Sequence, residues 1–299
     1  MKVNRLVLNL LAQSIIRSSK KRNKGTIIDE KYKEFLNIPY IDDGDTKHMY
    51  DVYKADEDKR NNICIIDIHG GAYMFGDKKH NYKFGLFFLD KGFDFIAIDY
   101  IPNKGKRDTS DIVSDCMTCI EHIYNHRSEY GLENSRFVLT GDSAGGHLAL
   151  LMSEMLEHKE IGKELGLNVP DFVPVCTLVN CPAYDYETLG EGLMTKGARK
   201  RMFGSNIDPE YMRKYSPKTY IKDFSLPLLL SSCKNDFVGA ESKKLDLDMK
   251  EKNNVYKYVY IDSDNPEVDH VHNVIKPDIE ESVYVNSEMV KFVLENLGY

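Results

Sequence analysis

The sequence predicts an α/β protein in which a mostly parallel sheet is covered by helices on both faces. Short apolar runs rich in β-branched residues recur along the chain, and segments with helical periodicity separate them. The runs are continuous and do not alternate with polar residues, which is typical of strands buried on both faces. Strands that alternate with helices form parallel βαβ units. With 299 residues, 42% of them hydrophobic, the chain can build one sizeable core, so we expect a single domain over residues 1–299.

The expected elements follow one another in a regular order. Extended segments at 35–41 and 47–54 flank the turn residues 42–45, which predicts an antiparallel hairpin at the edge of the sheet. Six apolar runs are expected to be strands within the sheet: residues 63–68, 93–100, 136–140, 173–179, 226–232 and 255–261. Three longer segments have helical character: residues 109–126, 147–156 and 280–297.

Residues 182–222 break this alternation. The segment is dense in Tyr, Met, Arg and Lys, and we interpret it as an inserted helical cap over the carboxyl ends of the strands. Apolar residues from Val3 to Ile15 fall near helical spacing, which predicts an amphipathic N-terminal helix that packs with the cap. We therefore expect cap elements from residues 1–35 and 182–222. Five side chains are candidates to line a pocket, with packing inside the cap as the alternative: Tyr184, Tyr186, Met194, Met202 and Phe203.

Charge and composition narrow the range of partners. The chain has 40 basic and 47 acidic residues and a net charge of −7, which disfavours nucleic-acid binding because that binding depends on neutralising phosphates. No stretch approaches the ~20 apolar residues of a membrane-spanning helix, so we expect no stable membrane insertion. Cys116 and Cys119 form a C-x-x-C pair, typical of a redox or metal site or of two positions on one helix. The helical periodicity favours the second interpretation, and we expect no metal and a reduced, cytoplasmic protein.

The pattern G-x-S-x-G at residues 141–145 predicts a sharp turn from a strand into a helix. Glycines flank the serine because a Cβ would collide in so tight a turn. The helix that follows presents backbone N–H groups at its first turn, where negative charge is favoured. The buried run before the pattern and the helical segment after it supply the context that such a turn needs. We therefore expect Ser143 to project from the sheet as a nucleophile.

A second glycine-rich segment, His69-Gly70-Gly71-Ala72-Tyr73, also follows a predicted strand directly. Taken alone, a pair of glycines favours an ordinary glycine turn. It precedes the serine turn by two strand-plus-connection units, which is where an anion-binding loop would face that serine. We expect the backbone N–H groups of Gly70 and Gly71, with that of Ala144, to form an oxyanion hole.

In the fold for which such a G-x-S-x-G turn is typical, an acid and then a histidine follow the serine along the chain, so we expect them in the last two loops at strand ends. Asp236 follows the strand at 226–232, and both His270 and His272 follow the strand at 255–261. The two histidines lie two residues apart in an extended or loop segment, and we expect their side chains to point in opposite directions. Only one histidine is expected to face both Ser143 and Asp236, and the other remains an alternative base.

The two glycine-rich motifs together resemble the hormone-sensitive-lipase-like branch of the α/β hydrolases. The resemblance runs from about residue 47 to the C-terminus, and it implies an α/β-hydrolase fold, hydrolysis of carboxylic esters and no cofactor. His270 matches the position of the catalytic histidine in that branch, and His272 stands where an aromatic residue is usual. The chain also departs from the branch at Ile101, where an Arg usually follows the Asp-Tyr pair.

The function expected from these residues is that of a serine carboxylesterase acting on short- to medium-chain acyl esters, acetyl esters included. Asp236 would orient His270, His270 would take the proton of Ser143, and an acyl-enzyme would follow. The same residues would serve an amidase, a formamidase or an acyltransferase. A non-catalytic small-molecule receptor is a further alternative, although such a protein would be expected to have lost one of the three residues. The expected partner is a small ester, and a homo-oligomer is left open.

Overall fold

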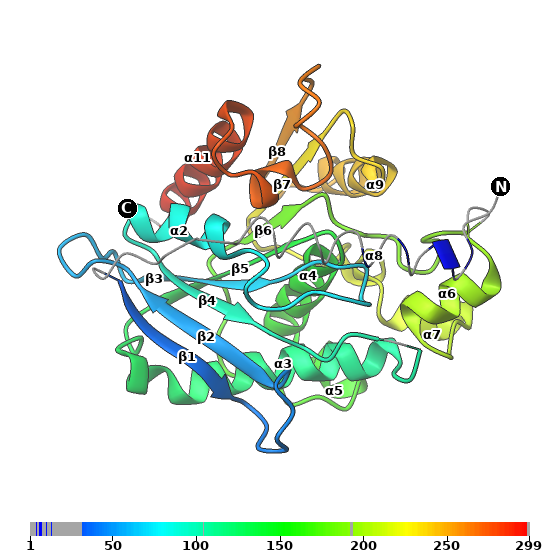
Figure 1. The fold of residues 1–299 in the computed structure, drawn as a ribbon, viewed down its shortest axis with the longest axis horizontal. Coiled ribbons are helices and arrows are strands. Elements are labelled where there is room, and N and C mark those ends of the chain that lie inside the picture. The colour runs from blue at the N-terminus through cyan, green and yellow to red at the C-terminus, as the bar shows by residue number, and fades with distance from the viewer. Residues whose placement is uncertain are drawn as a thin grey trace.

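The computed structural model describes residues 32–297 apart from Lys104, Gly192 and Leu193, together with Asn4, Leu6, Val7, Leu10 and Gln13. Within these ranges the chain forms one eight-stranded sheet between two layers of helices (Figure 1). The predicted N-terminal helix and its packing with the cap lie outside the described residues, apart from a few positions.

The sheet confirms the predicted α/β class. Its strands are β1 Lys33–Pro39, β2 Met49–Lys54, β3 Ile63–Ile68, β4 Asp94–Ile98, β5 Arg136–Asp142, β6 Thr177–Asn180, β7 Leu228–Cys233 and β8 Tyr256–Ile261. Their order is β1-β2-β4-β3-β5-β6-β7-β8. The six strands β4, β3, β5, β6, β7 and β8 run parallel to one another. β1 and β2 form the predicted antiparallel edge of the sheet. β6 is shorter than the predicted run at 173–179, since Val173 is 53% exposed and the next residue is a proline, which cannot donate a ladder hydrogen bond.

The three predicted helices are present, and others accompany them. The helices are α2 Tyr82–Asp90, α3 Thr109–His126, α4 Ala144–Glu157, α5 Lys159–Glu164, α6 Lys196–Phe203, α7 Pro209–Lys214, α8 Pro217–Tyr220, α9 Gly239–Lys250, α10 His272–Ile275 and α11 Glu280–Glu295, with a 3₁₀ turn at Arg127–Tyr130. No helix among these residues combines the length and apolarity needed to cross a bilayer. Cys116 and Cys119 lie on the buried face of α3 as free thiols, as the helical interpretation predicts.

Alternate side chains of the central strands pack into two separate cores. On β3, Cys64 and Ile66 face α3 and α4, whereas Ile63 and Ile65 face α2 and α11. Figure 1 shows α2 and α11 on one side of the sheet and α3 on the other. Because the strands are held on both faces, the loops at their carboxyl ends start from well-defined positions.

The segment predicted to form a cap contains the short helices α6, α7 and α8. In Figure 1, α6 and α7 lie together at one end of the molecule, beyond the strands. Tyr186 and Phe203 from this segment pack edge-to-face on each other and on Tyr73, with ring centroids 4.9 to 5.8 Å apart. These contacts join the segment firmly to the loop after β3. That residues 182–222 act as a cap over the carboxyl ends of the strands remains a prediction.

Candidate active site

Ser143 occupies the junction between β5 and α4 in a strained backbone conformation. Its φ is 54° and its ψ is −116°, a combination that costs a non-glycine residue about 1–3 kcal/mol. A Cβ on Gly141 would lie 2.2 Å from the carbonyl oxygen of Gly145, and a Cβ on Gly145 would lie 1.9 Å from that of Ile68. Both glycines are therefore required by close backbone contacts, as the motif predicts. The Ser143 N–H donates to the carbonyl of Asn180 at 2.8 Å, which ties the turn to β6.

The loop after β3 requires one correction to the sequence-based assignment. The Gly70 N–H donates to Asp142 Oδ1 at 2.8 Å, so it is occupied and does not point freely into a cavity. The N–H groups of Gly71, Ala72 and Ala144 donate to no other residue in the described ranges. Ala72 has a positive φ of 51°, which turns its backbone away from the strand direction. The N–H groups of this loop that are available to a ligand are therefore those of Gly71 and Ala72, whereas the prediction named Gly70 and Gly71.

Asp142 and Gly70 belong to a buried polar cluster that the sequence does not reveal. Asn81, at the start of α2, donates from Nδ2 to Asp142 Oδ1 at 2.7 Å and to Asp67 Oδ2 at 3.0 Å. Burial, and then the charge of Asp142, raise the pKa of Asp67 well above its usual range. The cluster joins β3, α2 and the serine turn, and it thereby fixes the distance between the glycine loop and Ser143.

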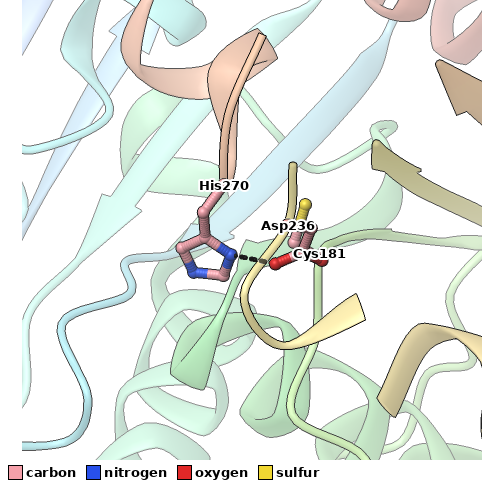
Figure 2. A group of neighbouring side chains, drawn as sticks. All are labelled: Cys181, Asp236 and His270. Carbon is pink, nitrogen blue, oxygen red and sulfur yellow. Dashed lines mark hydrogen bonds and ion pairs between the residues drawn. The ribbon is translucent and has the colours of Figure 1, made fainter. Parts of the chain in front are cut away.

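Asp236 and His270 form a close pair. Asp236 Oδ1 lies 2.6 Å from His270 Nδ1 (Figure 2). The same oxygen accepts the Val238 N–H at 3.0 Å, and Oδ2 accepts the Ser232 hydroxyl at 3.1 Å. Burial alone would raise the pKa of Asp236, but the hydrogen bonds from His270 and Val238 outweigh it and hold the pKa below its usual range. The carboxylate therefore stays ionised and keeps the remaining proton of a neutral His270 on Nδ1.

His272 lies in a different environment from His270. Val271, between them, has a left-handed φ of 55°, and α10 begins at His272. This turn directs His272 towards α11, where its Nδ1 lies 2.9 Å from the Ser282 hydroxyl. Burial lowers the pKa of His272 to about 4. The structure thus brings His270, and not His272, to Asp236.

Ser143 and His270 line one pocket of ≈340 Å³. Its apolar wall includes Phe75 and Ile275, and its polar side includes His80, Asn81 and Asp142. No hydrogen bond joins Ser143 to His270 among the described residues, and in many hydrolases this contact tightens only when substrate binds. The lining contains none of the five cap residues proposed for it. Packing explains three of them, because Tyr184, Tyr186 and Phe203 are completely buried.

Two further side chains near the pair were not anticipated from the sequence. Phe237 lies beside His270, with ring centroids 4.2 Å apart, yet 79% of its surface is exposed. Cys181 follows β6, and its sulfur accepts the Val271 N–H at 3.4 Å. Cys181 Sγ, a carboxylate oxygen of Asp236 and a ring nitrogen of His270 lie within 4.8 Å of one another. In the described part of the chain, this is the group of side chains that could together hold a metal ion.

Comparisons with known proteins agree with this architecture. Esterase B from Lactobacillus rhamnosis has a TM-score of 0.85 at 21% identity, with 97% of this chain and 96% of that chain covered. A truncated carbohydrate esterase from gut microbiota has a TM-score of 0.71 at 16% identity, with 89% and 99% covered. These likenesses confirm the predicted α/β-hydrolase fold.

Similarity in sequence is more limited in extent. A probable isoprenylcysteine alpha-carbonyl methylesterase of Arabidopsis thaliana is 24% identical over 185 residues, which are 61% of this chain and 43% of that protein. The chain thus spans less than half the length of this relative. The family model BD-FAE matches residues 50–249, two thirds of the chain, and includes the glycine loop, the serine turn and Asp236. The chain belongs to the BD-FAE family, within the α/β hydrolases.

Proposed function

We propose that the protein is a serine carboxylesterase with Ser143 as nucleophile, His270 as general base and Asp236 as the residue that orients His270. One observation carries the proposal: His270, paired with Asp236 at 2.6 Å, lines the same pocket as a serine held in a strained turn. A buried carboxylate, a partly exposed imidazole and a serine at the end of a strand are the parts that acyl transfer requires.

The reaction follows from the position of each group. His270 Nε2 takes the Ser143 proton as Oγ attacks the ester carbonyl, while Asp236 stabilises the imidazolium that forms. The N–H groups of Gly71, Ala72 and Ala144 receive the tetrahedral oxyanion, because that of Gly70 is held by Asp142. His270 then protonates the departing alcohol. Water repeats these steps on the acyl-enzyme and releases the acid.

The size of the pocket supports a small substrate. Its volume of ≈340 Å³ lies at the lower end of the range of about 300–1,000 Å³ for small-molecule sites. We therefore propose short- to medium-chain acyl esters, acetyl esters included. The six cysteines are free and buried, which fits a protein that works in the reducing cytoplasm.

An acyl-length series tests this function directly. Initial rates are measured on p-nitrophenyl esters from acetyl to palmitoyl, with the Ser143→Ala protein as the blank. We expect kcat/KM to peak between acetyl and hexanoyl and Ser143→Ala to lose about 10⁴-fold or more. Matched p-nitroanilides should react far more slowly. Faster cleavage of the anilides would favour the amidase alternative, and equal rates for wild type and Ser143→Ala would exclude both.

A further inference from the structure

Three ligand-type side chains converge where three neighbouring parallel strands end. Cys181 directly follows β6, Asp236 lies three residues after β7, and His270 lies in the loop after β8. Parallel strands bring their carboxyl ends to one edge of the sheet, so residues 34 and more positions apart meet there. Figure 2 shows the three side chains in one cluster, with the dashed Asp236–His270 contact at its centre.

A thiolate, an imidazole nitrogen and a carboxylate oxygen are together the ligands of zinc sites in proteins. Zinc binds sulfur at about 2.3 Å and nitrogen or oxygen at about 2.0–2.2 Å, in a tetrahedron that can leave one position to water. The three candidate atoms lie within 4.8 Å of one another, so a modest contraction would bring them around one ion. The proposed function leaves the Cys181 thiol unused.

The surroundings support such a site. Ser232 and the Val238 N–H already hold the Asp236 carboxylate, and hydrogen bonds of this kind orient metal-binding carboxylates. The side chain of His270 is 14% exposed and lines the pocket, while that of Asp236 is 0% exposed. An ion can therefore reach the cluster from the pocket by way of His270.

We propose that Cys181, Asp236 and His270 bind a thiophilic divalent cation such as Zn²⁺, and that its binding switches off the esterase. The inhibitory effect rests on the proposed function, whereas binding of the ion does not. Coordination replaces the proton on His270 Nδ1, and the neutral ring then carries its proton on Nε2. The Cys181 thiol releases its proton to solvent, so one proton leaves for each ion bound. A ring that carries hydrogen on Nε2 cannot accept the proton of Ser143, and the nucleophile stays inactive.

A metal titration of the esterase rate provides the first test. ZnCl₂ is added to the wild type, to Cys181→Ser and to Cys176→Ser, and each rate is divided by that of the same variant without metal. Cys176 is the matched control, because it is also fully buried and lies just before β6, but it is not part of the group formed by Cys181, Asp236 and His270. We expect Cys181→Ser to need at least about tenfold more Zn²⁺ for half-inhibition and Cys176→Ser to behave as the wild type. A chelator should restore the activity. Equal sensitivity of Cys181→Ser and the wild type overturns the proposal.

Binding is measured separately from activity with Cd²⁺. Cadmium bound to a thiolate absorbs in the ultraviolet, and the Ser143→Ala protein, which keeps all three ligands, should show this band with one ion per chain. Cys181→Ser should lose the band, and Cys176→Ser should keep it. If the band is present but the wild type has no esterase activity, the proposed function fails and the site stands. An active esterase whose Cd²⁺ band is absent, or survives in Cys181→Ser, means that the site is wrong.

Discussion

Replacing His272 by glutamine should remove much of the acid sensitivity of the folded protein while leaving catalysis largely intact. His272 is buried, with 2% of its surface exposed. Burial lowers the pKa of its imidazole from 6.5 to about 4. The folded protein therefore favours the neutral ring. The stability that results is fully present above pH 6.5, the unfolded value, and is lost as the pH falls from there through about 4.

The size of the effect follows from the pKa difference. Each pKa unit corresponds to 1.36 kcal/mol, and weighting by the two titration curves gives a loss of about 2 kcal/mol between about pH 7 and about pH 4.5. His272→Gln has no such group, so its free energy of unfolding should fall by about 2 kcal/mol less over this interval. Comparing pH slopes removes the cost of the substitution itself, which acts at both pH values.

Urea unfolding at the two pH values measures this difference. The wild type, His272→Gln and a control, His158→Gln, are compared, since His158 is a partly exposed histidine whose side chain is 30% accessible. We expect the control to keep the slope of the wild type. The esterase activity of His272→Gln should stay within about tenfold of the wild type, because only packing near the pocket changes. A wild-type slope in His272→Gln, or a loss of activity near 10⁴-fold, refutes the assignment of His272 as a buried structural residue.

Three further substitutions test the site. Asp236→Asn should lower kcat by about 10⁴-fold with the fold retained, because an amide at 2.6 Å from Nδ1 favours the wrong tautomer of His270; a decrease below tenfold would contradict this role. Gly145→Ala should abolish activity or folding, since the new Cβ would lie 1.9 Å from the Ile68 carbonyl oxygen. The control Gly197→Ala in α6 should be tolerated, because its new Cβ would have no atom within 4 Å. Thermal melts and esterase rates of the two variants test this difference. Phe237→Ala should raise KM by about tenfold with little change in kcat, because the exposed ring offers apolar surface at the pocket; a selective loss of kcat would argue otherwise.

The parts of the molecule that were predictable from sequence have strong local signals. Continuous apolar runs mark β3, β5 and β7, and one apolar face marks α3 over the same residues, 109–126. The serine turn was predictable because two glycines at fixed spacing satisfy a steric requirement: a Cβ on either one would lie only 1.9 or 2.2 Å from a backbone oxygen. The order of Ser143, Asp236 and His270 along the chain follows from the order of the strands.

The parts that were missed depend on contacts between distant residues. The sequence around Gly70 does not show what accepts a hydrogen bond from its N–H. The acceptor is Asp142 at the end of β5, which is 72 positions away in the chain. Asn81 became part of the site through α2, a nine-residue helix that was not anticipated from the sequence. Cys181 reaches Asp236 because β6 and β7 are neighbours in the sheet. The resemblance favoured His270 over His272, but the left-handed backbone at Val271, which separates the two side chains, has no local signal in the sequence.

The measurement that tests the account most directly is covalent labelling of the nucleophile. A p-nitrophenyl phosphonate reacts with a serine only where a base and an oxyanion site activate it, and it stays attached when the protein is digested. The account predicts one phosphonyl group per chain, on the peptide that carries Ser143, and none on Ser143→Ala or on His270→Ala. Labelling that persists in Ser143→Ala, or that falls on another serine of the wild type, would contradict the assignment of this site.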